Sequence, residues 1–449
     1  MHHQRRSGVR ALAAITAAAA LTLAGCSAPG GGSSAPAEVT DAISGPVTAE
    51  QVAQLGDLTL SVWADQGEQD FMDKVIPAYE DAYPNVTVDI QYKSYNDLMA
   101  TVLNAMNSAD APDVTQGNQG WATDGALVKA GLIRPLDDLA AAYDYEAAAG
   151  DSITQLEWSA DGSSFGSGSI YGMSPDNQMV GIFYNKAKLA ALGLDVPRTL
   201  DDFDKALAAA KDAGETPLIL GNSDKASAMQ TLSLVQGALT PAADTRAWIT
   251  GVDGATFDVP SNAEAIDHFA GWVSSGYVSP GYDGTSPDDA VAAFAAGDGV
   301  FFIGGNWYAG TIADGATFGF AAGLKDGGYA SSGSFGLPWH VSAKSDATLA
   351  ALAFVGMINS ADTATTLASV NRVPIHAVEA GEPGTIFPDL LTASAEQLDN
   401  GGPLYWYDWA TDTMFDTFTS GLQEVLGGQG SSSDLLTQIQ DDWAAFHTK

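Results

Sequence analysis

Strand-like and helix-like segments alternate along the chain from residue 58, and this order constrains the fold more than any other feature. Residues 58–63, LTLSVW, alternate apolar and polar side chains with a period of two, as strands do, and residues 85–92, NVTVDIQY, repeat the pattern. The segment between them carries an apolar stripe at helical spacing, formed by Phe71, Val75, Ile76 and Tyr79. Because a strand, helix, strand order favours parallel pairing, the pattern predicts an α/β fold with helices on the faces of the sheet.

The alternation continues into a further helix and strand, and it indicates where a ligand would bind. In residues 95–109, a second helical stripe consists of Leu98, Val102, Leu103 and Met106. Residues 111–120, APDVTQGNQG, follow as a strand and a loop. Ligands of such sheets bind at the carboxyl ends of the strands, so we expect the site in the loops after Trp63 and after Thr115.

The length of the chain predicts more than one domain. About 395 of the 449 residues follow residue 54, which is more than one hydrophobic core normally organises. The chain has a single cysteine, Cys26, so its stability must come from packed cores and not from a disulfide within the chain. We therefore expect two domains.

Residues 1–25 are typical of a secretory signal. Three arginines precede an apolar run of about 15 residues, which is shorter than the roughly 20 that span a membrane. The motif LAGC at 23–26 resembles the lipobox of bacterial lipoproteins, which implies that a lipid is attached to Cys26. The alternative is an ordinary secretory signal with an incidental cysteine. Residues 26–54, rich in Gly, Ser, Pro and Ala, are then predicted to be a lipid-anchored flexible tether.

The charge of the chain excludes two classes of partner. It carries 55 Asp+Glu against 18 Lys+Arg, a formal net charge of −37. Such a surface repels nucleic acid and anionic lipid, so we expect neither as a partner. The acids are spread along the chain, and we interpret them as a solvated surface that aids solubility; attraction of a cationic substrate is the alternative.

Several motifs follow one another in an order that is similar to one known family. They are YNDLMATVLNAMNSADAPDV, GLIRPLDDLA, IYGMSPDNQMVGIFYNKAKLAALGLDVPRTLDDFDKALAAAKDAG, AVAAFAAGDGVFFIGGNWYAG and RVPIH. In this order the chain resembles, over residues 58–446, the family 1 extracellular solute-binding proteins of carbohydrate ABC transporters, the maltose-binding-protein-like group. The motif LAGC agrees with the resemblance, because such receptors need a tether in cells that lack an outer membrane.

The resemblance implies a periplasmic-binding-protein type II fold, in which two discontinuous α/β lobes are joined by hinge strands and the ligand binds in the cleft between them. Lobe I would take residues 55–172 plus 335–368, and lobe II would take residues 173–334 plus 372–449. Hinge strands are expected near residues 171–181, near Phe335 and near residues 371–374.

The resemblance also implies a function. We expect an extracellular receptor that captures a carbohydrate, a di- or oligosaccharide, by hinge closure and delivers it to the permease subunits of an ABC transporter. We expect a monomer without cofactor, metal or enzyme activity, anchored through the lipid on Cys26 to the outer face of the cytoplasmic membrane.

A sugar presents an apolar C–H face and a rim of hydroxyls, so its receptor needs aromatic platforms and side chains that donate and accept hydrogen bonds. In the loops of lobe I, the resemblance places ligand-binding side chains at Asp65, Gln66, Glu68, Asn118 and Gln119, with Trp121 as a wall of the pocket. Loop solvation and helix capping are the alternative roles of these polar residues.

In lobe II, the resemblance points to aromatic residues. Trp307 follows the strand-like stretch GVFFIGG, at the turn where the family has a stacking tryptophan; a structural role at a domain junction is the alternative. Not all aromatic residues of PLYWYDWATDTMF (403–415) can face one ligand, and we select Trp406, Tyr407 and Asp408.

Further candidates lie at the predicted hinges. Asp176 and Asn177 precede the long strand-like stretch, and Gly333 and Ser334 could offer backbone N–H groups. Arg372 could clamp a pair of sugar hydroxyls, or it could form a structural ion pair.

Two other functions stay open. A secreted glycoside-active enzyme needs two carboxylates about 5 to 10 Å apart, and 55 acids make chance pairs uninformative. The sequence carries no zincin, nucleophile-elbow or phosphate-loop motif. Residues 283–289, DGTSPDD, lack the spacing of a calcium loop and are better explained as a turn with a helix N-cap. A polyamine-binding transport receptor of the same fold would also suit acidic and aromatic loops.

Overall fold

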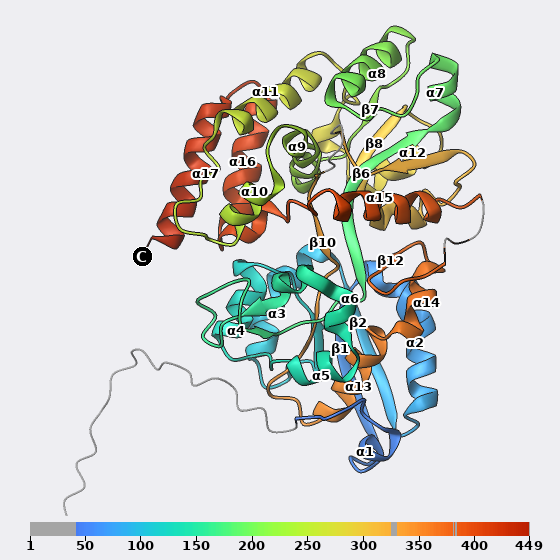
Figure 1. Ribbon diagram of the computed structural model, residues 1–449, viewed down its shortest axis with the longest axis vertical. Helices are drawn as coiled ribbons and strands as arrows, with labels where there is room; N and C mark the ends of the chain where they lie inside the picture. Colours follow the sequence, from blue (N-terminus) through green and yellow to red (C-terminus); the bar gives the residue numbers. More distant parts are fainter. Residues whose placement is uncertain (1–41, 325–329, 380, 382–383, 449) are drawn as a thin grey trace, which may run out of the picture. The chain divides into compact units, whose positions relative to one another are not determined.

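Two large sheets and a two-stranded sheet of β4 and β5 organise the chain, whose computed structural model describes residues 42–324, 330–379, 381 and 384–448 (Figure 1). The strands are β1 (Leu58–Asp65), β2 (Val86–Lys93), β3 (Val114–Gln116), β4 (Glu157–Trp158), β5 (Ser169–Ile170), β6 (Asp176–Asn185), β7 (Leu218–Ile219), β8 (Phe301–Gly305), β9 (Phe318–Ala321), β10 (Gly333–Phe335), β11 (Trp339–Val341) and β12 (Val373–Pro374).

Helices connect and cover these strands. They are α1 (Ala49–Ala53), α2 (Gln69–Ala82), α3 (Tyr95–Asn107), α4 (Ala126–Lys129), α5 (Asp137–Ala142), α6 (Tyr145–Ala149), α7 (Lys186–Leu192), α8 (Leu200–Asp212), α9 (Ala226–Leu239), α10 (Ala242–Ile249), α11 (Pro260–Ser274), α12 (Pro287–Ala295), α13 (Thr348–Ile358), α14 (Ala364–Ala368), α15 (Phe387–Asp399), α16 (Met414–Leu426) and α17 (Ser432–His447). The short helical turns are η1 (Gln66–Glu68), η2 (Trp121–Gly125), η3 (Gly150–Leu156), η4 (Tyr282–Gly284), η5 (Asn306–Gly310), η6 (Ala361–Thr363) and η7 (Tyr407–Ala410).

The first sheet has four strands in the order β11-β3-β1-β2. β1 is parallel to β2 along its whole length and parallel to β3, which confirms the pairing predicted from the alternating pattern. β11 arrives from far downstream and pairs antiparallel with β3. Helix α2 lies alongside β2 (Figure 1). In α3 the expected stripe is wrong at one position: Leu98, Val102 and Met106 are fully buried, but Leu103 is 39% exposed.

The second sheet is built around β6, which is ten residues long. Its first half pairs antiparallel with β10 and β12, and its second half pairs antiparallel with β8 and β9. The strands β10 and β12 lie where hinge strands were expected, near Phe335 and residues 371–374, and both run beside the start of β6. The lobe boundaries themselves stay a prediction.

The predicted tether, residues 26–54, is wrong at its C-terminal end. Residues 42–54 belong to the folded part of the chain: Val47 and Val52 are buried in the core under the first sheet, and α1 is capped by Thr48. Hydrogen bonds add to this burial, because the Tyr83 hydroxyl donates to the Val47 carbonyl oxygen at 2.8 Å and Asn85 Nδ2 donates to the Val52 carbonyl oxygen at 3.1 Å. The small-residue composition of the segment does not reveal these contacts. Residues 26–41 of the predicted tether, and Cys26 with the predicted signal, lie outside the described residues.

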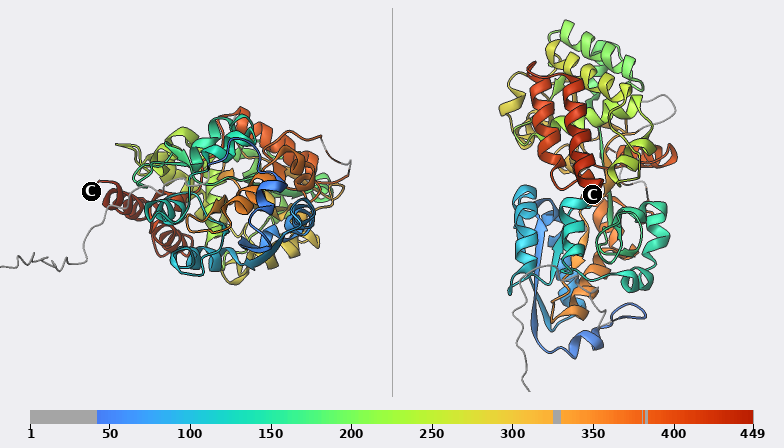
Figure 2. Two further views of the ribbon diagram at one scale, coloured as in Figure 1. Left: turned by 90° about the horizontal axis from the view of Figure 1, so that it is seen from below. Right: turned by 90° about the vertical axis from the view of Figure 1, so that its left-hand side faces the viewer.

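One apolar cluster connects the C-terminal helices to helices beside the first sheet. The C-terminal helices α16 and α17 pack side by side (Figure 2). Their buried residues, among them Phe418 and Leu435, belong to the same apolar cluster as Val102 of α3 and Leu127 of α4. Trp63 of β1 and Trp121, in the turn after β3, pack against this cluster, so it reaches the loops where the site was expected.

A buried ion cluster joins the two sheets near the predicted hinges. The Arg372 guanidinium donates from Nε and Nη2 to the two carboxylate oxygens of Asp176, at 2.9 and 2.8 Å, and from Nη1 to Glu68 at 2.5 Å. Asp176 and Glu68 are only 2% and 4% exposed. Asp176 opens β6, Glu68 follows β1 and Arg372 precedes β12, so one guanidinium ties together three segments that are distant in sequence.

Replacing Arg372 by leucine is expected to lower the free energy of unfolding by about 3 to 5 kcal/mol, because two buried carboxylates lose their cation. Denaturant unfolding followed by circular dichroism measures the change. The control is Arg198→Leu, which removes the Arg198–Glu396 ion pair with its 48% exposed arginine side chain and is expected to cost less than about 1 kcal/mol. Equal losses in the two variants would contradict a structural role of the cluster.

Candidate ligand-binding site

The loops that follow β1 and β3 meet at one edge of the first sheet. The two strands are parallel, so their carboxyl ends, Asp65 and Gln116, lie at the same edge. The Asp65 N–H donates to Gln116 Oε1 at 2.8 Å, and Asp65 Oδ1 caps η1 by accepting from the Gly67 N–H at 2.8 Å. Gln66 is exposed, and Glu68 is committed to the ion cluster.

Asn118 is the hydrogen-bonding centre of this edge. Its Nδ2 donates to Tyr95 Oη at 3.0 Å and to Asp408 Oδ2 at 3.1 Å, while its Oδ1 accepts from Trp409 Nε1 at 3.0 Å. Because an indole N–H can only donate and a carboxylate can only accept, these partners fix which way the amide faces. The loop after β3 is thereby joined to the segment before α16, 290 residues along the chain.

Gly120 permits this close approach. A Cβ at Gly120 would lie 2.5 Å from Cβ of Trp409, and its φ is +95°, a conformation that other residues rarely adopt. The backbone of the loop can therefore lie directly against Trp409.

The carboxylates of Asp408 and Asp65 lie near Tyr95, and both are partly desolvated. Burial raises the pKa of Asp408 to about 6, against the opposing effect of the Asn118 hydrogen bond. Burial likewise raises the pKa of Asp65 to about 6, although the Gly67 N–H acts in the other direction. The pKa of Tyr95 is raised by burial and by the charges of Asp408 and Asp65. Both acids are thus mainly ionised at neutral pH, as acceptors for hydroxyl donors.

Tyr95 is the residue that the sequence prediction missed. It is the first residue of α3 and follows β2 and the helix N-cap Ser94, and the residue is 38% exposed. The signal that could have found it was present: β2 is parallel to β1, so the loop after β2 lies at the same edge as the other candidate loops.

Two tryptophans form an aromatic surface at a second position. The ring centroids of Trp307 and Trp406 are 5.8 Å apart at 49°, and Trp307 is 36% exposed. Trp307 lies in η5 directly after β8, packed so closely on Gly305 that a Cβ there would be 2.0 Å from the indole. Trp406 Nε1 donates to Ser334 Oγ at 2.7 Å, which fixes its ring. Exposed aromatic faces of this kind can stack on the C–H face of a sugar.

Other predicted contacts are placed differently. Tyr407 was wrong as a ligand contact: it is 2% exposed, its hydroxyl donates to Gln236 at 2.6 Å and its ring stacks on Phe418 at 4.7 Å. The buried face of η7 takes Tyr407 into the core, and its neighbours Trp406 and Asp408 stay half-buried. Arg372 forms ion pairs with two buried carboxylates, which is the structural role named as the alternative to clamping hydroxyls.

The remaining candidates serve the framework around these two groups. Gln119 donates to the carbonyl oxygens of Phe335 and Gly336, at 3.2 and 3.1 Å. Gly333 and Ser334 lie in β10, paired with Met179 and Gln178, and Asn177 is half-buried in β6. Asp176 belongs to the ion cluster.

Trp121 lines an aromatic wall beside Asn118. Its ring contacts Trp158 at 5.0 Å and Phe446 of α17 at 5.4 Å, edge to face. Trp158 in turn stacks on Phe165 at 4.5 Å. The Trp121 Nε1 is buried and has no hydrogen-bond partner.

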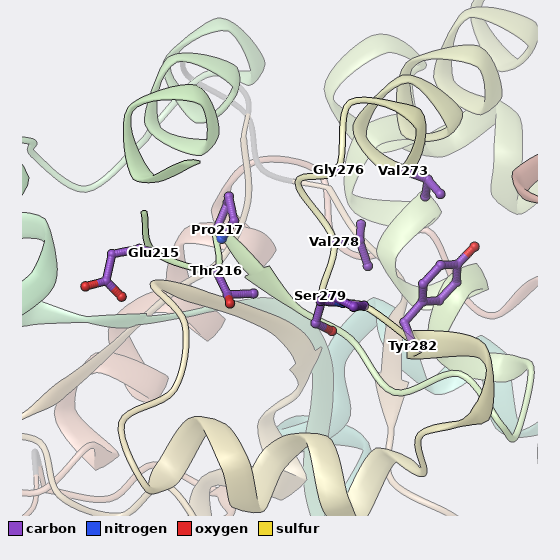
Figure 3. A pocket seen from close by; sticks show the side chains of 10 residues that line it. Glu215, Thr216, Pro217, Val273, Gly276, Val278, Ser279 and Tyr282 are labelled. Carbon is purple, nitrogen blue, oxygen red and sulfur yellow. The ribbon is translucent and has the colours of Figure 1, made fainter. Parts of the chain in front are cut away.

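A pocket of about 400 Å³ lies elsewhere, against β7 (Figure 3). It is lined by Glu215, Thr216, Pro217, Val273, Gly276, Val278, Ser279, Pro280, Gly281 and Tyr282, none of which was predicted as a site residue. Glu215 and Tyr282 lie at opposite sides of it (Figure 3), and Glu215 is already paired with Lys188 at 2.6 Å. This lining offers no aromatic pair and no free charge to hold a sugar.

Neither a calcium loop nor a metal cluster emerges from the residues that the structure describes. Ser286 caps α12 by accepting from the Asp289 N–H, which confirms the turn and N-cap predicted for residues 283–289. Among the described positions, no group of three or more His, Cys, Asp or Glu side chains could hold a metal ion.

Comparisons with known proteins agree with this architecture. Residues 74–386 match the family described as bacterial extracellular solute-binding protein. The fold is similar to that of a chitin oligosaccharide binding protein, with a TM-score of 0.74, 20% identity and coverage of 88% of this chain and 100% of that one. It is also similar to the GacH receptor of Streptomyces glaucescens, with a TM-score of 0.70, 19% identity and coverage of 88% and 99%.

One curated relative is similar in sequence over a shorter range. It is a probable sugar-binding periplasmic protein of Mesorhizobium japonicum, 30% identical over 126 residues, which are 28% of this chain and 30% of that relative.

Replacing Asp408 by asparagine is expected to stabilise the empty protein at neutral pH. The folded state holds the Asp408 proton more tightly than the unfolded state, since its pKa is raised from 3.8 to about 6. Stability is therefore lost as the pH rises from about 4 to about 6, by roughly 1 to 3 kcal/mol. Asparagine keeps an acceptor for Asn118 and removes the buried charge.

Thermal melts at about pH 4 and about pH 7.5 measure this effect, and the melting temperature should rise by several degrees only at the higher pH. The control is Asp412→Asn, at an exposed position of the same segment, which should change neither melt. An equal rise at both pH values would contradict the desolvated carboxylate.

Proposed function

The chain belongs to the family of bacterial extracellular solute-binding proteins, and on that premise we propose that it is a sugar receptor that delivers a di- or oligosaccharide to an ABC permease. The observation that carries this proposal is the presence of two kinds of surface. Trp307, which is exposed, and Trp406, which is half-buried, form an aromatic surface, and Asn118, Asp408 and Tyr95 form a group that can both donate and accept hydrogen bonds. A sugar needs both kinds of surface.

The proteins of similar fold support the choice of ligand. They include the chitin oligosaccharide binding protein and a protein in complex with raffinose, and the GacH receptor is described in complex with acarbose. Each of these ligands is an oligosaccharide or resembles one. We therefore place a short oligosaccharide first among the ligands to test.

We propose that binding proceeds by hinge closure. The strands β10 and β12 run beside the start of β6, and bending there would separate Asn118 from Asp408. A sugar entering between them would replace their 3.1 Å hydrogen bond by bonds to its hydroxyls, and closure would complete them. The proposed contacts are Asp65, Asn118, Asp408, Trp307 and Trp406, with Tyr95 added and Tyr407 removed.

We propose that the receptor is exported and anchored by a lipid on Cys26. The support is the order of arginines, apolar run and LAGC motif at the start of the sequence. A single acyl chain holds a protein to a membrane only marginally, so stable anchoring requires the several chains of a lipoprotein. No helix among the described residues is long and apolar enough to cross a bilayer. A monomer that docks on the permease subunits completes the proposal.

The first test is a thermal-shift screen of the protein against mono-, di- and oligosaccharides and polyamines, with product analysis of every hit. A saturable rise in melting temperature with the sugar recovered intact is expected. Shortened sugar products would instead favour a glycoside-active enzyme, for which Asp65 and Asp408 are the acids to mutate. A response to polyamines alone would contradict the carbohydrate ligand.

Trp307→Ala is expected to weaken binding of the sugar found in the screen by more than about tenfold, because a stacking face is lost. The melting temperature of the empty protein should hardly change, since Trp307 is 36% exposed. Isothermal titration calorimetry measures the affinity. The control is Tyr277→Ala, a half-buried aromatic residue outside the proposed contacts, which should retain the affinity. Unaltered affinity with a large loss of stability would make Trp307 a core residue.

A further inference from the structure

A fully buried histidine, His340, packs against the loop of residues 117–125, which contains the proposed contact Asn118. His340 of β11 is 0% exposed, its Nδ1 lies 2.8 Å from the carbonyl oxygen of Tyr171, and its Nε2 lies 3.0 Å from Asp124 Oδ1. A carbonyl oxygen can only accept, so Nδ1 carries a proton. The bond between Nε2 and Asp124 needs a second proton. The pair therefore holds one proton more than a neutral imidazole beside an ionised carboxylate.

Asp124 belongs to η2, the turn that follows Asn118 and contains Trp121. Inside the turn, the Asp124 N–H donates to the Asn118 carbonyl oxygen at 3.2 Å. The Gly117 N–H donates to the Pro338 carbonyl oxygen at 3.0 Å, so the segment before β11 holds the start of the loop. A Cβ at Gly117 would lie 2.3 Å from Asp124 Oδ1 and 2.6 Å from His340 Nε2, which shows how tightly the pair is packed under the loop.

We propose that the proton shared by His340 and Asp124 fixes the turn of residues 117–125 against β11, and thereby sets the position from which Asn118 meets the ligand. His340 and Asp124 are positioning residues and do not contact the sugar themselves. This inference rests on the proposed function for its effect on binding, whereas the shared proton stands on the geometry of the pair.

If the shared proton holds the loop in place, the position of residues 117–125 should become less fixed at high pH, where the proton is lost. Asp124 is the charged side chain that faces His340; Arg134, on the segment whose backbone bonds to β11, pairs with Asp138 at 2.8 Å. Burial lowers the pKa of His340, but the charge and hydrogen bond of Asp124 outweigh it, and the pKa is raised. The stabilisation is thus complete below the usual histidine pKa and is lost as the pH rises through the raised value. The deprotonated pair would place two lone pairs against each other in a buried site.

The substitution Asp124→Asn tests the role of the shared proton separately from that of the hydrogen bonds that position the loop. An asparagine amide at 124 can donate to Nε2 of a neutral imidazole, whose Nδ1 still donates to Tyr171. The hydrogen bonds to Tyr171 and to residue 124 are then kept without the extra proton, and the pH dependence should disappear. The matched control is His268→Gln, because His268 is also 3.0 Å from a carboxylate, that of Asp204, but on the part-exposed surface of α11.

The experiment uses the full-length chain with 15N-labelled histidine, and His340→Gln assigns the His340 signals. Long-range 1H–15N spectra at neutral pH should show both ring nitrogens of His340 protonated, and in Asp124→Asn only Nδ1. Hydrogen exchange of residues 117–125, corrected for the intrinsic rates, should accelerate at high pH in the wild type and in His268→Gln but not in Asp124→Asn.

Calorimetry with the sugar found in the screen supplies the functional readout. The wild-type affinity should fall by about fivefold or more between about pH 7 and about pH 9.5, and Asp124→Asn should show a flat profile. An unprotonated Nε2 in the wild type, or identical pH profiles in wild type and Asp124→Asn, would overturn the proposal. If no sugar binds at all, the proposed function fails, while the spectra and the exchange of residues 117–125 still decide the role of the pair.

Discussion

The structure depends on one buried guanidinium. Arg372 is paired with Asp176, at the start of β6, and with Glu68, at the end of η1, and so connects the central strand of the second sheet to the loop edge of the first. Two carboxylates that are almost fully buried are tolerated only with such a cation. The same contacts place the loop after β1 beside that after β3, because Gln116 donates to Glu68 at 3.2 Å and accepts from the Asp65 N–H. The positions of the loops that form the site therefore depend on this ion cluster as well as on the pairing of the strands.

The polar groups of the site are already hydrogen-bonded within the protein, so new hydrogen bonds to a sugar would add little to the free energy of binding. The Asn118 amide bonds directly to Tyr95, Asp408 and Trp409. A sugar that replaces these bonds exchanges one hydrogen bond for another, with a small net gain of about 1 kcal/mol or less for each. The indoles of Trp307 and Trp406 gain contact with the sugar without giving up an equivalent partner. Stacking would then supply affinity, and the polar groups would select among sugars by leaving wrong hydroxyls unpaired.

Much of the first sheet could be predicted because its periodicity is strong: β1, β2, α2 and α3 appear where the pattern placed them. Leu103 shows the limit, since an apolar residue at the margin of a helical stripe can point either way. Tyr407 shows a second limit, since spacing cannot tell which of several consecutive aromatic residues turns into the core. Tyr95 could have been found, because the loop after β2 ends at the same sheet edge as the loop after β1. The His340–Asp124 pair depends on a contact between distant segments, which one sequence does not reveal.

The central claim is that a sugar binds between the Asn118 group and the indoles of Trp307 and Trp406. A crystal structure of the protein with a sugar found in the screen tests this most directly. The account predicts a sugar ring stacked on Trp307, with hydroxyls in place of the hydrogen bond between Asn118 and Asp408. A sugar seated in the pocket against β7, with the Asn118–Asp408 bond intact, would contradict it.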